Sequence, residues 1–242
     1  MMSFYDDTQH SFTNFAMTGI DERHVGMEMG FKIPTDFPNL ALQGVIGYGE
    51  YYYTSNPRMY QVVDNNAKIV ENVYGVVVPY WKSHPNVDGT ISRHYVESTP
   101  QLAVSLGFSW NWNYWFVDTD LDYFAHSYLS MNPLTRTDWV TAGPDRIVTP
   151  EEVEYMARQE KFAPAWLLNF SVGKSWYIQR KYQLGFSLNA KNLLNNTWVK
   201  TGGYEATRIV ESTTTKERFY RFDSKYFYMS GFNYMLNIYF RF

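Results

Sequence analysis

Three aspartates at alternate positions are the strongest candidates for chemistry in this chain. Asp118, Asp120 and Asp122 would share one face of a strand, with roughly 6–7 Å between neighbouring carboxylates. Such a row could bind a cation or a basic substrate, or it could be a solvated polar surface that pairs with basic side chains on other strands. A glycosidase pair is excluded, because nothing nearby supplies the different environments that separate a general acid from a general base.

The other chemical signals point away from an enzyme. Five histidines are scattered without metal-ligand spacing, and cysteine is absent. The chain contains neither a G-x-S-x-G elbow nor a phosphate-binding loop. We therefore expect no catalytic residues, no metal site and no cofactor.

Aromatic residues form 19% of the chain, and several fall between the apolar segments. Their rings could stack on a sugar or an aromatic chelate, or they could pack within the loops. The net charge of -3 argues against a nucleic-acid partner. The candidates for contact with a ligand are Trp81, Tyr95, Trp139, Trp198, Tyr204 and Tyr220.

Strands must position these residues, because alternation with a period of two dominates the chain. The face opposite the apolar side chains carries Gly, Ser, Asn, Asp and Gln, whereas the outer face of a soluble sandwich would be rich in Lys, Glu and Thr. We therefore predict an all-β antiparallel transmembrane barrel segment of about eight strands, counting a partial strand near residues 11–17. The clearest alternating segments are residues 25–32, 40–49, 102–112, 115–123, 166–173, 182–189 and 232–242.

The links between these segments alternate in length. Short links lie near residues 34–39, 113 and 179–181, and long ones at residues 54–98, 129–162 and 196–231. This alternation is typical of short periplasmic turns and long extracellular loops.

Two of the long links should contain structure of their own. Thr149 followed by Pro150 and Glu152 predicts a helix that runs to about Gln159. Residues 73–81 are apolar and alternating, and we prefer a hairpin within the first long loop to a further membrane strand.

The last eleven residues form the most regular segment. Residues 232–242 alternate between apolar and polar side chains and end at Phe242, and their number suits a tilted strand across a bilayer. The mean hydropathy of -0.39 and the lack of a long apolar run give no expectation of a transmembrane helix.

Residues 185–196 resemble the penultimate strand of TonB-dependent outer-membrane receptors. The resemblance lies in a motif formed by Asn189, Asn192, Leu193, Leu194 and Asn195. Residues 231–242 resemble the last strand of that family, and residues 98–102 resemble the start of a strand in Bacteroidetes-type members. The chain departs from the family at Phe232, where Arg is frequent.

The resemblance implies a barrel of about 22 strands with an N-terminal plug. Members import siderophores, cobalamin, glycans or peptides through the TonB complex, which contacts a short box before the plug. Residues 1–242 would form one domain, the C-terminal part of the barrel, so we expect the plug, the box and about fourteen strands to be missing.

The resemblance also implies the partners and the location of the chain. The partners would be outer-membrane lipid, the plug and remaining strands, the TonB complex reached through the plug, the barrel-assembly machinery and a small-molecule or oligosaccharide substrate. Tyr234, Phe240 and Phe242 would form the signal that the assembly machinery reads through strand pairing. The protein would lie in the cell outer membrane, with a periplasmic C-terminus and extracellular long loops.

Two other classes stay open. The first residues have neither a basic stretch nor an apolar one, so no signal peptide is visible, and we expect a fragment of a longer protein. About eight strands could close into a complete small outer-membrane barrel, which would act as a porin, an adhesin or an outer-membrane enzyme. A soluble glycan-binding β-sandwich would instead bury the apolar faces as a core.

Overall fold

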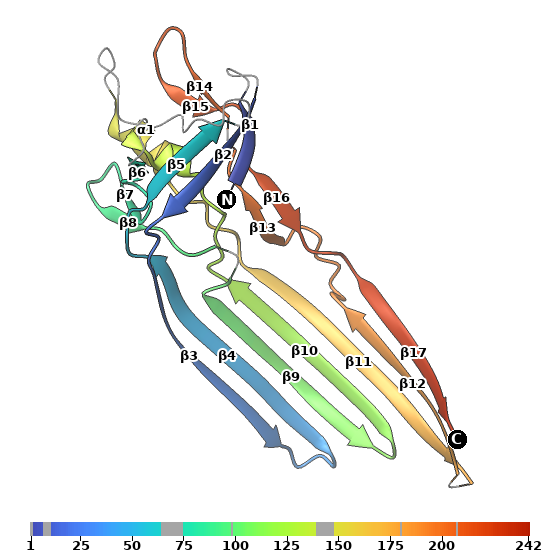
Figure 1. The fold of residues 1–242 in the computed structure, drawn as a ribbon. Helices are drawn as coiled ribbons and strands as arrows, with labels where there is room; N and C mark the ends of the chain where they lie inside the picture. Colours follow the sequence, from blue (N-terminus) through green and yellow to red (C-terminus); the bar gives the residue numbers. More distant parts are fainter. Residues whose placement is uncertain are drawn as a thin grey trace.

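The computed structural model describes residues 2–6, 11–63, 75–97, 99–138, 148–179, 181–206 and 208–242. Its largest element is a seven-stranded sheet in the order β17-β12-β11-β10-β9-β4-β3, with every neighbouring pair antiparallel (Figure 1). The predicted all-β antiparallel class is confirmed, since each of the seven alternating segments is a strand of this sheet. The strands are β3 (Glu22–Pro34), β4 (Leu40–Tyr53), β9 (Leu102–Trp112), β10 (Trp115–Ala125), β11 (Ala165–Ile178), β12 (Tyr182–Lys191) and β17 (Asn233–Arg241).

The register places large apolar side chains in rows on one face of this sheet, which we call the apolar face. One row runs from Met29 through Ile46, Val104 and Tyr123 to Trp166. Side chains on this face are open to their surroundings, and those of the edge strands are the most exposed: Met27 and Ile238 are 72% and 67% exposed.

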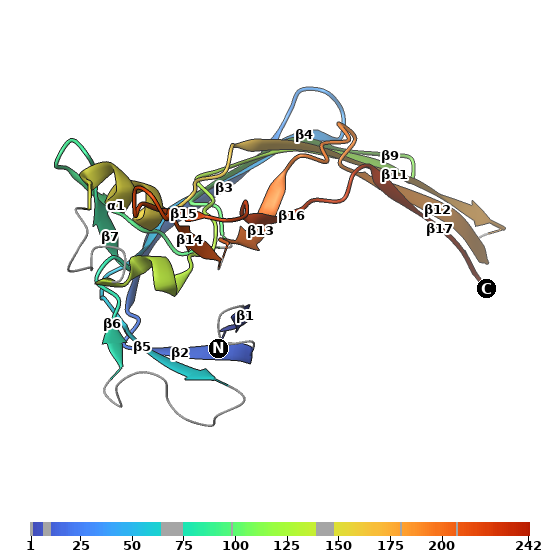
Figure 2. The same ribbon diagram turned by 90° about the horizontal axis from the view of Figure 1, so that it is seen from above.

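The opposite face, which we call the polar face, carries mostly small and hydrophilic side chains, with Val45 and Phe116 among the exceptions. One of its rows runs through Lys32, Gln43, Gly107, Asp120 and Asn169. The sheet is curved when it is seen from above (Figure 2).

Three short links join neighbouring strands at one end of the sheet. The turn between β9 and β10 is Asn113-Tyr114, and both residues have positive φ angles, 46° and 63°. Such φ angles are those of the hairpin turn whose twist matches that of the flanking strands. The other two short turns also contain a residue with positive φ. Asn39, with a φ of 60°, ends the turn between β3 and β4, and Gln179, with a φ of 50°, begins the turn between β11 and β12.

Three long links leave the other end of the sheet, as the alternation of loop lengths predicts, and hold the remaining elements (Figure 1). The link after β4 holds β5 (Arg58–Val63), β6 (Val76–Val77), β7 (Ser83–Pro85) and β8 (Ile91–Arg93). The link after β10 holds η1 (Pro133–Arg136) and α1 (Pro150–Ala157), and the link after β12 holds β13 (Lys200–Tyr204), β14 (Ile209–Glu211), β15 (Arg218–Tyr220) and β16 (Lys225–Tyr228).

The helix α1 begins as predicted. The Thr149 hydroxyl accepts a hydrogen bond from the Glu152 N–H at 3.3 Å, and Pro150 occupies the first turn. It ends at Ala157 rather than near Gln159, because Arg158 is already extended. Within the described chain, neither helical segment has the length and apolar character needed to cross a bilayer.

One sequence prediction changes at the N-terminal strands. Residues 11–17 lie in a strand, β2 (Ser11–Thr18), but β2 belongs to a separate sheet in the order β1-β2-β5-β6, with β1 at Met2–Asp6. The chain bends between β2 and β3 at Gly19, which has a φ of 76°, so β2 pairs with β5 beyond the end of the large sheet. The large sheet therefore has seven strands rather than about eight.

The described part of the apolar segment at residues 73–81 also lies outside the large sheet. Its first two residues lie outside the described residues, and Val76–Val77 pairs with β5 in the same small sheet. It is thus part of a hairpin in the first long link, and it is not a strand of the large sheet.

Candidate functional site

The long links pack into one body on the polar side of the sheet. We call this body the loop lobe: it consists of β1, β2 and residues 54–63, 75–97, 126–138, 148–164, 196–206 and 208–230. Tyr53, at a polar-face position of β4, packs in a cluster with Phe15, Met59 and Trp81. Leu167, at a polar-face position of β11, packs with Val199. Both contacts lie at the ends of strands, so the lobe covers one end of the polar face, whereas apolar-face residues such as Met29, Ile46 and Trp166 stay exposed. Figure 2 shows the lobe beside one end of the sheet.

The three aspartates share the polar face of β10, as the alternation predicts. Asp120 Oδ1 accepts a hydrogen bond from Gln43 Nε2 at 3.3 Å, and Asp122 Oδ2 accepts one from Asn169 Nδ2 at 2.8 Å. Among the described residues, no three acidic, histidine or cysteine side chains converge in a way that could hold a metal ion. Amide groups rather than basic ones therefore satisfy two of the three carboxylates.

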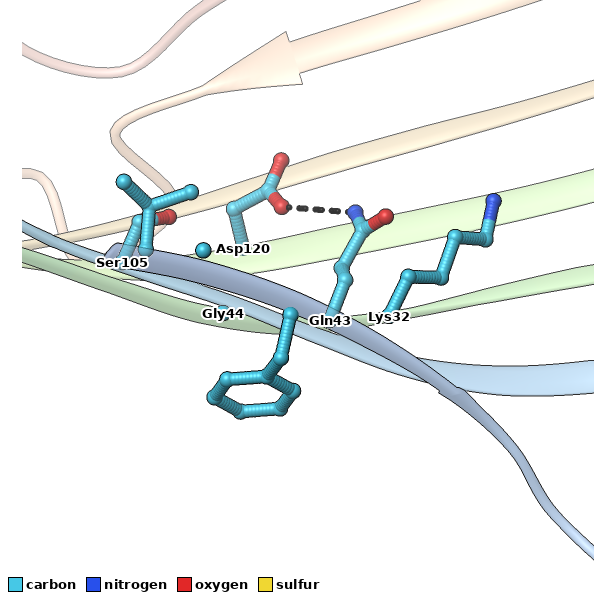
Figure 3. Close-up of a pocket in the computed structure, with 8 residues that line it drawn as sticks. Lys32, Gln43, Gly44, Ser105 and Asp120 are labelled. Carbon is cyan, nitrogen blue, oxygen red and sulfur yellow. Dashed lines mark hydrogen bonds between the residues drawn. The ribbon is translucent and has the colours of Figure 1, made fainter. Parts of the chain in front are cut away.

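Lys32 and Gln43 join Asp120 around a hollow in the polar face that sequence reasoning missed. The hollow has a volume of about 370 Å³ (Figure 3), and both polar and apolar residues line it: Gly30, Phe31, Lys32, Gln43, Gly44, Val45, Ser105 and Asp120. The strand register could have indicated this hollow, because the two-residue turn between β9 and β10 places Gly107 opposite Asp120.

Trp81 is buried in the core of the loop lobe. Its ring lies 5.2 Å from that of Tyr53, and the residue is only 6% exposed. In this structure the ring is therefore used for packing inside the lobe and is not presented to a ligand.

The other predicted loop aromatics have different surroundings. Tyr95 stacks on Tyr128 with ring centroids 4.5 Å apart, whereas Trp198 and Tyr204 are exposed. The Tyr220 hydroxyl donates to the carbonyl oxygen of Met156 at 3.0 Å, and burial raises its pKa to about 12. Trp139 lies outside the described residues.

A buried ion pair joins two of the long links. No local sequence pattern predicted it. Arg136 at the end of η1 is fully buried, and its Nη2 donates to Glu205 Oε1 at 2.7 Å. Glu205 Oε2 also accepts the Asn132 N–H at 2.8 Å, and Arg136 Nη2 donates to the Arg158 carbonyl oxygen at 3.0 Å. The pair connects η1, the end of α1 and the residues after β13.

A histidine pair lies at the β7–β8 hairpin, with His84 in β7 and His94 directly after β8. His84 Nδ1 and His94 Nε2 are 2.7 Å apart, and His94 Nδ1 is 2.8 Å from the Trp81 carbonyl oxygen. Burial lowers the pKa of His94 to about 3 and lowers that of His84 below its ordinary value, with the positive charge of Arg136 acting in the same direction. Both rings are therefore neutral at physiological pH, and His94 donates from Nδ1 while it accepts at Nε2.

The motif that ends β12 forms a turn with a defined structural role. Asn192 and Asn195 have φ angles of 53° and 51°, a region that Asn tolerates better than most residues. The Asn192 side chain, 3% exposed, accepts the Asn196 N–H at 3.0 Å and donates to the carbonyl oxygens of Asn196 and Ser230 at 3.1 and 3.0 Å. The turn thus connects the end of β12 to the residues that lead into β17.

The other members of the motif lie around this turn. Asn189 accepts a hydrogen bond from the Ser171 hydroxyl at 2.9 Å on the polar face. Leu193 and Leu194 are exposed, so they are candidates for contact with an apolar environment outside the chain.

The last strand lies at one edge of the sheet. Tyr234 and Phe240 pair with Ala190 and Leu184 of β12, and Phe242 follows the strand with 95% of its surface exposed. All three side chains are accessible for recognition, and their role as an assembly signal stays a prediction.

Aromatic residues border the apolar face at both ends. Near the short turns they are Trp110, Trp112, Trp115, Trp176, Tyr182 and Phe240, and near the loop lobe they are Tyr48, Tyr123, Trp166 and Tyr234. Between them the face consists mainly of Val, Leu, Ile, Met and Phe.

Comparison with protein-family models, with curated proteins and with solved structures finds no match for this chain. The functional argument therefore rests on the sheet, its two faces and the loop lobe.

Proposed function

We propose that this chain forms part of the wall of an outer-membrane transporter of the TonB-dependent receptor type. The observation that carries this function is the apolar face, which is continuous across seven strands, exposed, and bordered by aromatic residues at both ends. The polar face would line the inside of the barrel, and the loop lobe would lie on the extracellular side. The chain would have no catalytic role.

The height of the apolar band supports a membrane environment. The path along β10 from Trp115 to Tyr123 is about 27 Å at about 3.4 Å per residue. A tilt of about 40° reduces this to about 21 Å, close to the roughly 25 Å of a lipid-facing band between aromatic girdles. A soluble domain would instead leave these side chains in water, at about 1.5–3 kcal/mol for each large one.

The position of the loop lobe argues against a soluble sandwich. In a sandwich a second sheet covers the apolar face of the first. Here the lobe packs on Tyr53 and Leu167, which belong to the polar face. The apolar face needs a different cover, and lipid provides one.

The two edge strands of the sheet would need further strands as partners in the transporter. Among the described residues, β3 and β17 each pair with one neighbour only. Unpaired backbone groups are not tolerated in the hydrocarbon region, so further strands must cover both edges in a membrane. In a receptor of the proposed type these would be the remaining barrel strands, around a plug that contacts the TonB complex.

Transport specificity would depend on the polar face and the lobe together. A nutrient taken up from outside would first meet the lobe, where Trp198 and Tyr204 are exposed, and then the polar face. The turn of Asn192 and Asn195 and the strand β17 are the features that resemble the receptor family, and they support this class over other barrels.

Fluorescence quenching in detergent micelles tests the lipid-facing assignment. The chain has no cysteine, so Leu236→Cys and Asn237→Cys each place one labelled site on opposite faces of β17. After refolding of each full-length variant in micelles that contain brominated detergent, we expect strong quenching of a bimane at position 236 and weak quenching at 237. Equal quenching at both positions, or a chain that stays monodisperse at high concentration without detergent, would contradict the proposed function.

A further inference from the structure

A row of tyrosines with a basic residue at each end lies where the apolar face meets the loop lobe. The register of β3 and β4 pairs Arg23 with Tyr52, and an isolated bridge pairs Tyr52 with Tyr95. The Tyr95 ring stacks on Tyr128 with ring centroids 4.5 Å apart, and a second bridge pairs Tyr128 with Lys161. Directly opposed residues of antiparallel strands have their side chains on one face. Because Tyr52 is at an apolar-face position of β4, these five residues, which we call the tyrosine row, continue that face.

Backbone hydrogen bonds hold the tyrosine row in place. Residues 94–96 pair with residues 51–53 through two of them, at 2.9 and 3.1 Å. The Gln159 side chain accepts the Tyr95 N–H at 2.8 Å and donates to the carbonyl oxygens of Tyr95 and Leu129 at 2.8 and 3.1 Å. The row is therefore one fixed surface rather than a set of independent loop side chains.

Three basic side chains on or beside the row have no ion-pair partner. Arg93, at the end of β8, has its Cζ 4.8 Å from the centre of the Tyr52 ring, so Arg93 and Arg23 both lie next to this tyrosine. Among the described residues, neither arginine nor Lys161 forms an ion pair or a side-chain hydrogen bond, and all three are exposed. Glu50, two residues before Tyr52 on the same face, is also exposed and pairs with none of them. The positive charges of the row are thus not neutralised within the described part of the chain.

The distance from the aromatic border places the row at the level of lipid headgroups. Tyr52 lies four residues beyond Tyr48, a path of about 14 Å at about 3.4 Å per residue. A strand tilt of about 40° reduces this to about 10 Å along the membrane normal. The headgroup layer on each side of the hydrocarbon core is roughly 5–8 Å thick, and long arginine side chains extend towards it. The phosphate groups of lipids therefore lie within reach of Arg23 and Arg93.

We propose that the Arg23 end of the tyrosine row binds the phosphate group of an anionic lipid in the leaflet next to the loop lobe. Arg23 and Arg93 would donate to the phosphate oxygens beside Tyr52, because guanidinium groups offer paired N–H donors that suit phosphate. The acyl chains of the lipid would then lie along Val25, which is 54% exposed and two residues from Arg23 on the same face. This site rests on the proposed function, since the row meets lipid only if the apolar face does.

Quenching by brominated lipid in micelles of a neutral detergent tests the site in the full chain, with phosphatidic acid as the probe. A bimane on Val25→Cys reports lipid beside Arg23, and a bimane on Leu236→Cys reports lipid at the other edge of the sheet. We compare brominated phosphatidic acid with brominated phosphatidylcholine at the same mole fraction. We expect the anionic lipid to be enriched at position 25 and not at position 236.

Substitution of the basic residues assigns the enrichment to them. Arg23→Gln and Arg93→Gln should each reduce the enrichment at position 25 about fivefold, the factor that corresponds to about 1 kcal/mol per basic residue at an anionic lipid surface. Both residues are exposed, so the variants should fold. Lys32→Gln is the matched control, because it removes the same charge from the opposite face of β3, and it should leave the enrichment unchanged.

The salt used in the titration distinguishes a lipid site from a site for free phosphate. Sodium phosphate and sodium chloride at equal ionic strength should reduce the enrichment equally, and a greater loss in phosphate would overturn the proposal. Equal enrichment at positions 25 and 236, or equal effects of Arg23→Gln and Lys32→Gln, would also overturn it. Strong quenching at position 236 and weak quenching at 237 by brominated detergent, without enrichment at position 25, would refute the lipid site and leave the membrane assignment intact.

Discussion

The side chain of Asn195 holds the backbone of Phe232 at the start of the last strand. Asn195 Oδ1 accepts the Phe232 N–H at 2.9 Å, and a Cβ atom on the neighbouring Gly231 would lie 2.6 Å from the same oxygen. Together with Asn192, which donates to the Ser230 carbonyl oxygen, this contact fixes where the chain enters β17. The register of the terminal strand is therefore set by the turn that follows β12.

Removal of the Asn192 side chain should destabilise this turn. Asn192→Ala leaves the Asn196 N–H and the Ser230 carbonyl oxygen without their partner and places Ala at a φ of 53°. We expect a loss of about 2–3 kcal/mol from unsatisfied buried groups, measured as a shift of the urea midpoint in micelles. Asn192→Gly separates the two causes, because it removes the side chain without backbone strain. An unchanged midpoint in both variants would contradict the role given to the side chain.

A side chain at Gly107 should disrupt the sheet, whereas one at Gly47 should be tolerated. A Cβ atom at Gly107 would lie 2.0 Å from a backbone oxygen, but at Gly47 the nearest atom is Glu28 Cγ at 3.6 Å. We expect Gly107→Ala to lower the free energy of unfolding by about 1–3 kcal/mol through overpacking and Gly47→Ala to change it by less than about 1 kcal/mol. Urea unfolding of the two variants in parallel measures the difference. Similar stabilities would show that the strands β9 and β10 are farther apart than described.

The seven strands of the large sheet and their two faces could be predicted because the signal is local. Alternation with a period of two places Asp118, Asp120 and Asp122 on one face whatever the neighbouring strands are. The start of α1 was also predictable, because Thr149 and Pro150 act on their own helix. The separation of β2 from the large sheet was not, because it depends on a bend at Gly19 and on pairing with residues 40 to 50 positions away in the sequence.

The interior of the loop lobe and the hollow could not be predicted for a related reason. Arg136 and Glu205 are 69 residues apart, and neither has a neighbour in sequence that indicates an ion pair. Trp81 was predicted to contact a ligand, because residue type alone does not show whether a side chain is exposed or buried. The site of Lys32, Gln43 and Asp120 depends on the register of four strands, which only the complete set of turns determines.

The buried ion pair of Arg136 and Glu205 should contribute more to the stability of the lobe than the more exposed pair of Lys200 and Glu160. Glu205→Gln leaves the charge of Arg136 buried without its partner, for which a loss of about 3–5 kcal/mol is expected. Glu160→Gln weakens a pair with Lys200 that is 28–35% exposed at its side chains, and the expected loss is below about 1 kcal/mol. Trp81 lies in the lobe core, so tryptophan fluorescence during urea unfolding can compare the variants. A larger loss for Glu160→Gln would show that the lobe does not depend on the buried pair.

The histidine pair should make the lobe less stable in acid. The ordinary pKa of histidine is 6.5, and burial lowers that of His94 to about 3 in the folded lobe. Between these values the unfolded chain binds a proton that the folded lobe excludes, so stability is complete above pH 6.5 and falls as the pH decreases towards 3. At about pH 5 the loss from His94 alone should be about 2 kcal/mol, at about 1.4 kcal/mol per pH unit. His84, whose pKa is also lowered, adds to the loss in the same direction.

Hydrogen exchange of the lobe amides at pH 7.5 and pH 5, corrected for intrinsic rates, measures this effect. His24 is the matched control, because it is exposed and lies outside the lobe core. His94→Gln should remove part of the additional opening at pH 5, while His24→Gln should leave it unchanged. Carboxylates elsewhere in the chain also titrate, so the difference between the two variants, rather than the total change with pH, decides the role of the pair. If the two variants lose protection equally between pH 7.5 and pH 5, the pair does not control the acid sensitivity of the lobe.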